Sequence, residues 1–164
     1  MSINNREKNH EEYMQNACEL SELSLIRGGG PFGAVIIEKS SGEIMGKGHN
    51  MVTIKSDPTL HAEMVAISDA CHNLNTHDLS GCAIYTSCEP CPMCLSAIYW
   101  ARIDEVYFGN TKEDAKRIGF DDSFIYDEIK KPVEERAIKM ERIGENLTKV
   151  AFEQWTVKED KVRY

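Results

Sequence analysis

The chain has 164 residues, of which 41% are hydrophobic and 28% charged, so it is long enough for one ordinary globular domain with a real core. Its net charge of −8 argues against a general polyanion-binding surface, because binding phosphates requires clustered lysine and arginine. No apolar run approaches the ~20 residues that a membrane span needs. We therefore expect one domain over residues 1–164 that binds neither nucleic acid nor membrane.

The amino terminus and the cysteines suggest a compartment. Residues 1–13 are polar and lack the apolar segment of a signal peptide. Six cysteines in a chain without such a signal favour metal binding or buried thiols over disulfides. We therefore expect a cytoplasmic protein.

The first elements are predicted to be a helix and a β-hairpin. Apolar residues recur at helical spacing over residues 6–26, and the run Gly28–Pro31 ends the helix. That run lacks the Gly-Lys-Ser/Thr of a phosphate-binding loop, so we interpret it as a turn into a strand. Strands are predicted at residues 32–37 and 43–50. Asn50, which ends the second strand, is either a plain turn residue or an amide that contacts a base edge.

The next predicted helix carries two residues of chemical interest. Asp57 and Pro58 form a helix-start signal, and the pattern predicts a helix that runs to about Leu74. His61 and Glu63 then fall in its first turns, where the backbone N–H groups and the helix dipole favour an anion.

The middle of the chain alternates strands and helices. Strands are predicted at residues 82–86 and 105–110, with a helix at residues 91–101 between them. This rhythm implies crossover connections and a sheet that is covered on both faces.

The carboxy-terminal part is predicted to be less regular. Residues 111–137 are irregular to helical, and the pattern then predicts a last strand at Ile138–Ile143. A final helix is predicted at residues 146–159, where apolar residues form one face.

Three residues have the chemistry and spacing of a metal site. Cys91 and Cys94 form a C-x-x-C pair at a predicted helix start, and His61 can supply a nitrogen ligand to the same ion. Mixed nitrogen and sulfur ligands suit zinc, and three of them leave the fourth tetrahedral position for water. Glu63 is not needed as a ligand, and we expect it to be the catalytic residue that takes a proton from that water. The order H-x-E and then P-C-x-x-C is typical of zinc-dependent nucleobase deaminases.

Two other metal sites must be weighed. Cys88, Cys91 and Cys94 form C-x-x-C-x-x-C, as in part of an iron–sulfur run, but Ile98 stands where that run needs a fourth cysteine. A closed structural zinc site that adds Cys88 to the three ligands is the better alternative. A closed site would leave Glu63 without a role, so we favour an open catalytic site with one zinc ion per chain.

Beyond the zinc motif, the chain resembles the cytidine deaminase-like superfamily and, within it, the bacterial guanine deaminases. The resemblance spans nearly the whole chain and rests on Gly30–Val35, Ser56–Pro58, His61–Glu63, Tyr85–Arg102, Gly119–Tyr126 and Tyr164. It implies an α/β fold, a three-layer α/β/α sandwich with a central mixed sheet of about five strands. It also implies a homodimer and the zinc-dependent hydrolysis of guanine to xanthine and ammonia.

The resemblance also implies roles for individual residues. Those at purine-binding positions are Asn50, Asp122 and Tyr164, and the aromatic residues near the base are Phe32 and Trp100. His61, Cys91 and Cys94 match the zinc ligands, and Glu63 matches the proton shuttle. The C-terminal helix and tail, residues 146–164, could pack on the dimer partner as exchanged segments, so that Tyr164 reaches either its own site or the partner's.

Other functions stay open at this point. One is a deaminase of another base or nucleoside, such as cytosine, guanosine or transfer-RNA adenosine. Another is a non-enzymatic zinc-stabilised domain, against which Glu63 argues. Charge argues against the transfer-RNA substrate, since the segment Glu141–Tyr164 holds five acidic and five basic residues and so has no basic platform.

Overall fold

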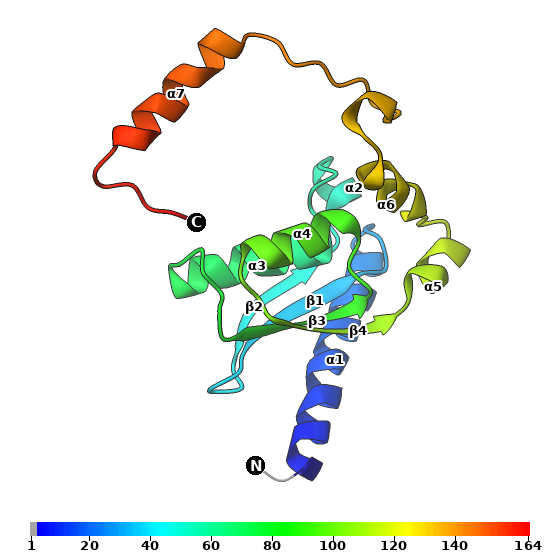
Figure 1. Cartoon of the computed structure of the whole chain (residues 1–164). Coiled ribbons are helices and arrows are strands. Elements are labelled where there is room, and N and C mark those ends of the chain that lie inside the picture. The colour runs from blue at the N-terminus through cyan, green and yellow to red at the C-terminus, as the bar shows by residue number, and fades with distance from the viewer. Residues whose placement is uncertain (1–2) are drawn as a thin grey trace. The chain divides into compact units, whose positions relative to one another are not determined.

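A four-stranded mixed sheet organises the first part of the molecule (Figure 1). The computed structural model describes the backbone of residues 3–164 and the side chains from residue 9 onward. The strand order is β2-β1-β3-β4, with bounds Ile44–His49, Gly33–Glu38, Cys82–Cys88 and Glu105–Asn110. β1 is antiparallel to β2 and β3, whereas β4 runs parallel to β3. The hairpin and the crossover rhythm predicted from the sequence are both confirmed.

Helices cover both faces of this sheet, as Figure 1 shows. On one face, α1 (Ile3–Ile26) packs over a buried cluster that includes Val35, Ile37 and Tyr85. On the other, α3 (Ala62–Leu74) and α4 (Pro92–Trp100) cover a cluster that includes Ala34, Ile36, Ile84 and Ile98. Successive residues of β1 and β3 alternate between the two clusters, as side chains on a strand must. The three-layer α/β/α class is therefore confirmed.

Two glycines of β2 let α3 lie directly on the sheet. A Cβ atom at Gly48 would lie 2.1 Å from the carbonyl oxygen of Ala62, and one at Gly46 would lie 2.4 Å from that of Ala66. Real side chains do not tolerate such distances, so only glycine allows this approach. The first turn of α3 is therefore held against the strand that ends at His49.

The remaining elements are short helices and one longer one. They are α2 (Val52–Lys55), α5 (Lys112–Arg117), α6 (Ser123–Lys130), the 3₁₀ turn η1 (Val133–Glu135) and α7 (Glu145–Val157). The chain divides into two compact units, Met1–Asp122 and Ser123–Tyr164. Within the described part of the chain, no helix is both long and apolar enough to cross a membrane.

Two predictions of secondary structure were wrong. The helix predicted from Asp57 begins only at Ala62, because the Asp57 carboxylate accepts hydrogen bonds from the backbone N–H and hydroxyl of Thr59 and closes a local turn. Ile138–Ile143 is not a strand, so the sheet has four strands instead of about five. A strand needs a neighbour for its backbone groups, and residues 123–164, all of which the structure describes, contain no other strand.

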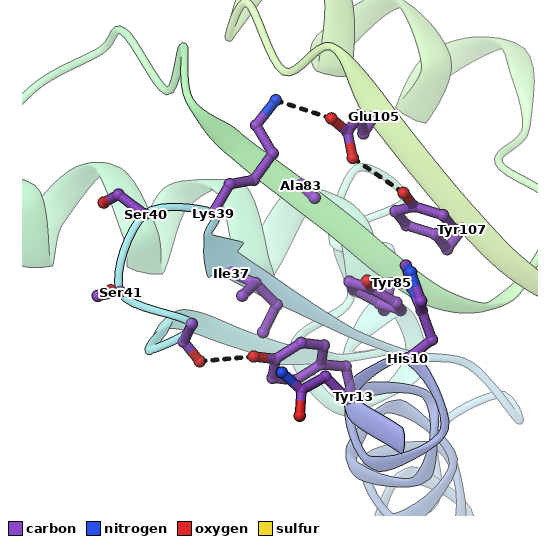
Figure 2. Close-up of a pocket in the computed structure, with 12 residues that line it drawn as sticks. His10, Tyr13, Ile37, Lys39, Ser40, Ser41, Ala83, Tyr85, Glu105 and Tyr107 are labelled. Carbon is purple, nitrogen blue, oxygen red and sulfur yellow. Dashed lines mark hydrogen bonds and ion pairs between the residues drawn. The ribbon is translucent and has the colours of Figure 1, made fainter. Parts of the chain in front are cut away.

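A cavity of about 440 Å³ lies on the α1 side of the sheet, where Figure 2 shows its lining. Polar groups around it already have partners: Tyr13 donates to the carbonyl of Gly42, and the Glu105 carboxylate accepts from Lys39 and Tyr107. Ile37, Ala83 and Tyr85 in its lining belong to the cluster under α1. The predicted ligands belong to α3 and α4, on the opposite face, so this cavity is not the metal site.

Candidate metal centre and active site

The predicted zinc ligands lie at the starts of two helices that cover the same face of the sheet. His61 is the N-cap residue directly before α3, and Cys91 is the N-cap residue directly before α4. Both have extended backbones, and Pro92 occupies the first position of α4, where its fixed φ suits a helix start. Helix N-termini carry free N–H groups and a positive partial charge, which favours thiolates and anions at this place.

The three donor atoms already form a metal-sized cluster. His61 Nδ1 lies 3.5 Å from the Sγ atoms of both Cys91 and Cys94, and all three donor atoms lie within 4.8 Å of one another. A tetrahedral zinc ion with ordinary bond lengths places nitrogen and sulfur ligands about 3.6 Å apart. The donor set and its spacing therefore fit one zinc ion per chain, as predicted.

Hydrogen bonds among the three side chains favour the thiolate form of Cys91. The pKa of Cys91 is lowered to about 4, first by a hydrogen bond from the Cys94 side chain and also by His61. The same contact with Cys91 raises the pKa of Cys94, and a hydrogen bond with Cys91 raises the pKa of His61. A thiolate held by neighbouring donors is the form of cysteine that binds metal.

Glu63 is buried beside this cluster and is not part of it. It lies in the first turn of α3, two residues beyond His61, and is 6% exposed. Burial raises the pKa of its carboxyl, because the charged form loses hydration. A carboxyl with a raised pKa can hold and release a proton nearer neutral pH, as general acid–base catalysis requires.

Cys88 does not join the ligands. Its thiol donates to the carbonyl oxygen of Thr111 at 3.7 Å, and burial raises its pKa to about 11. The metal-sized cluster contains only His61, Cys91 and Cys94 among the described residues. The geometry therefore favours the open three-ligand site over the closed one that would include Cys88.

Asn50 has a defined orientation near the end of β2. Its Oδ1 accepts hydrogen bonds from the backbone N–H groups of Gly30 and Val52, each at 3.3 Å. Both neighbours are donors, so the oxygen must face them and the amide nitrogen must face away. Asn50 can therefore present N–H donors to an acceptor atom of a ligand.

Aromatic and acidic side chains come from the segment just before β1 and from the last residues of the first unit. Phe32, just before β1, meets Phe120 edge to face with ring centroids 4.9 Å apart. Burial and the charge of Cys91 raise the pKa of Asp122, which follows two residues later. Phe120 was not among the predicted site residues, although the aromatic and acidic run Gly119–Phe124 was the signal that could have named it.

Comparison with known proteins decides the family. Residues 7–110 match the family described as the cytidine and deoxycytidylate deaminase zinc-binding region. Over 148 residues, which are 90% of this chain and 94% of the relative, the sequence is 48% identical to guanine deaminase of Bacillus subtilis (strain 168). The X-ray structure of guanine deaminase from B. subtilis has a TM-score of 0.89 and 46% identity, covering 94% of this chain and 98% of that one. The chain belongs to the guanine deaminase family.

Two further relatives of this guanine deaminase family chain match a smaller part of it. A structure of guanine deaminase from Nitrosomonas europaea is 34% identical, with a TM-score of 0.65, and covers 68% of this chain and 64% of that one. The transfer-RNA-specific adenosine deaminase of Aquifex aeolicus (strain VF5) is 43% identical over 98 residues, 60% of this chain and 64% of the relative. The B. subtilis match is longer than the 122 residues of the first unit, so it also includes part of the second.

Two residues that the guanine deaminase resemblance placed near the base, Trp100 and Tyr164, have exposed side chains. Trp100 ends α4 and is 67% exposed, about 9 Å farther along the helix axis than Cys94. Tyr164 ends the second unit and is 73% exposed. The roles of both residues stay predictions.

Proposed function

We propose that this protein hydrolyses guanine to xanthine and ammonia with one zinc ion per chain. The observation that carries the proposal is the His61–Cys91–Cys94 cluster with buried Glu63 beside it. It occurs in a chain that is 48% identical, over 90% of its length, to a guanine deaminase. The substrate is the part of the proposal that comes from the relative, whereas the reaction type comes from the site.

Glu63 performs the proton transfers in this proposal. When bound, zinc lowers the pKa of a water molecule in its open position and so makes a nucleophile available near neutral pH. The Glu63 carboxyl accepts a proton from water and delivers it to a ring nitrogen, which makes the neighbouring carbon more electrophilic. A carbon–oxygen bond forms there, Glu63 takes the remaining proton from the new hydroxyl and gives it to the exocyclic amine, and the carbon–nitrogen bond then breaks to release ammonia and leave the carbonyl of xanthine.

Three side chains of the first unit are proposed to hold the purine. Asn50 offers N–H donors, because its oxygen is already engaged by backbone groups. Asp122 offers a half-buried carboxyl that can accept from the N–H groups of the base. Phe32, supported by Phe120, offers an aromatic surface for the ring. A wrong base would leave buried polar groups unpaired, and that is how a hydrogen-bonding site rejects it.

The second unit is proposed to complete the enzyme in a homodimer. Helix α7 carries Leu147, Val150, Phe152 and Trp155, and none of its residues is buried. An uncovered apolar helix face favours association with another chain, as in the predicted exchange of C-terminal segments. Its test is the mass in solution: a monomer at micromolar concentration would contradict the dimer. Six free cysteines agree with a reducing compartment, and the cytoplasm stays the predicted location.

A panel of free bases and nucleosides tests the substrate most simply. Zinc-loaded protein is incubated with guanine, guanosine, adenine, adenosine and cytosine, and ammonia release is measured for each. We expect guanine to be turned over with the highest kcat/KM and xanthine to form in equal amount to ammonia. A higher kcat/KM for any other compound would overturn guanine as the substrate while leaving the deaminase reaction intact.

The second candidate is deamination of adenosine within transfer RNA. It is favoured by the 43% identity to the A. aeolicus enzyme over 98 residues. The net charge of −8 argues against it, since phosphate contacts need basic side chains. Filter binding of transfer RNA at physiological salt decides between them: we expect no binding at micromolar protein, and a tight, salt-sensitive complex would favour this candidate.

A further inference from the structure

The carbonyl oxygen of Asn50 is held by two buried side chains from different elements. Ser24, near the end of α1, is fully buried and its hydroxyl donates to this oxygen at 2.9 Å. His49, the last residue of β2, places Nδ1 3.2 Å from the same oxygen. Ser24 is 26 residues away in sequence, so the contact ties α1 to the end of the hairpin.

The contacts of His49 determine which of its nitrogens carries the proton. Its Nε2 lies 3.3 Å from the Arg27 guanidinium, which can only donate. Nε2 must therefore accept, which leaves the proton on Nδ1 and makes Nδ1–H a donor to the Asn50 carbonyl. The carbonyl thus accepts two hydrogen bonds, from Ser24 and from His49, and both of its lone pairs are used.

The glycine turn after α1 closes around the same peptide. Gly29 donates its N–H to the carbonyl of Ser24, and a Cβ atom at Gly29 would lie 2.3 Å from the Asn50 carbonyl oxygen and 2.5 Å from the Ser24 hydroxyl. The next residue, Gly30, donates to the Asn50 side-chain oxygen. The glycine run, which the sequence predicts to be a turn into a strand, therefore contacts both the backbone carbonyl and the side-chain carboxamide of Asn50.

We propose that Ser24 and His49 are positioning residues, which fix the Asn50 peptide and so aim its carboxamide N–H groups at the purine. The proposal rests on the proposed role of Asn50 in binding the base. Neither side chain touches the substrate in this account. Each keeps the Asn50 backbone from rotating. Such a rotation would move the side-chain amide away from the acceptor atom of the purine.

A double-mutant cycle tests this, with guanine kinetics as the readout. Ser24→Ala should lower kcat/KM roughly 3- to 10-fold, mainly through KM, as expected for the loss of one supporting hydrogen bond. In the Asn50→Ala background the same change should alter kcat/KM less than about twofold, because the group that Ser24 positions is gone. His49→Phe, which keeps an aromatic ring but removes the donor, should behave in the same way and serves if Ser24→Ala does not fold.

The matched control is Ser21→Ala, one turn earlier on α1, whose hydroxyl donates to the nearby carbonyl of Cys18. We expect it to change kcat/KM less than about twofold. Equal losses from Ser24→Ala in both backgrounds would overturn the positioning role, because a general loss of stability does not depend on the Asn50 amide. If Ser24→Ala and His49→Phe had wild-type kinetics while Asn50→Ala was impaired, the positioning role of Ser24 and His49 would be overturned and the role of Asn50 would stand. Wild-type kinetics in Asn50→Ala would overturn the role of Asn50 itself.

Discussion

Helices α3 and α7 have the same length of 13 residues but opposite relations to the rest of their units. In α3, Ala62, Glu63, Ala66 and Ala70 are buried, and the alanines lie on the glycines of β2. In α7 no residue is buried, although its side chains include phenylalanine and tryptophan. A helix seated on a sheet by small residues can hold a catalytic carboxyl in one place. A helix whose large apolar residues stay exposed instead favours contact with a surface outside its own unit.

The largest effect should come from the metal ligands at the starts of α3 and α4. Cys91→Ala is expected to lose zinc and to lower kcat by about 10⁴-fold or more, since the metal contributes several kcal/mol to the transition state. Cys88→Ala is the matched control, because its thiol bonds Thr111 and lies outside the cluster. Metal analysis should find one zinc per chain in Cys88→Ala. Full occupancy in Cys91→Ala would show that the ligand set is wrong.

The next effect should come from Glu63, which we expect to move protons without binding metal. Glu63→Gln keeps the shape of the side chain but removes the acid–base group, so kcat should fall about 10²–10⁴-fold with zinc retained. Glu105→Gln, on the α1 side of the sheet, controls for the loss of a carboxylate. Near-normal turnover by zinc-loaded Glu63→Gln would remove Glu63 from the mechanism.

A smaller effect should come from the tail of the second unit. Lys161 donates to the carbonyls of Trp155 and Thr156, so a truncation that keeps Lys161 preserves the end of α7. Deleting Val162–Tyr164 should leave zinc content unchanged and lower kcat/KM roughly tenfold, as expected for the loss of one aromatic contact with the base.

Mixing tells which site the tail serves. Truncated protein combined with full-length Glu63→Ala should recover activity if the tail crosses a dimer, and should not if it serves its own chain. Unchanged kinetics in the truncated protein itself would show that the tail takes no part.

The smallest effect should come from the close contact between Gly48 and the first turn of α3. A Cβ atom at Gly48 would lie 2.1 Å from the carbonyl of Ala62, so Gly48→Ala must push the start of α3 off the sheet. We expect about 1–3 kcal/mol lower stability, measured by urea unfolding, together with weaker zinc retention. Thr148→Ala, on the uncovered α7, is the control and should change zinc retention little. Zinc retention that survives Gly48→Ala would show that the ligands do not depend on this contact.

The zinc site was predictable because its functional residues occur as two short motifs, each with a fixed spacing. C-x-x-C and H-x-E each place their groups within one helical turn, and the predicted ligands His61, Cys91 and Cys94 do form a cluster. The start of α3 was mispredicted because Asp57 caps a turn instead of the helix. Sequence signals for a cap and for a local turn use the same residue types, so they cannot be told apart without the backbone.

Other features depended on contacts between distant residues. Ser24 has no sequence signature, and its role becomes visible only when α1 brings its hydroxyl to the Asn50 carbonyl. Ile138–Ile143 was predicted to be a strand, but a strand also needs a partner, and the local sequence does not show whether one is available. The roles of Trp100 and Tyr164 came from resemblance alone and stay untested.

The most direct test of the central claim is guanine turnover by the same sample before and after zinc removal. We predict equal amounts of xanthine and ammonia from the zinc-loaded protein, loss of both after chelation, and recovery when zinc is restored. Turnover of guanine that continues at the same rate in protein shown to contain no metal would contradict the account.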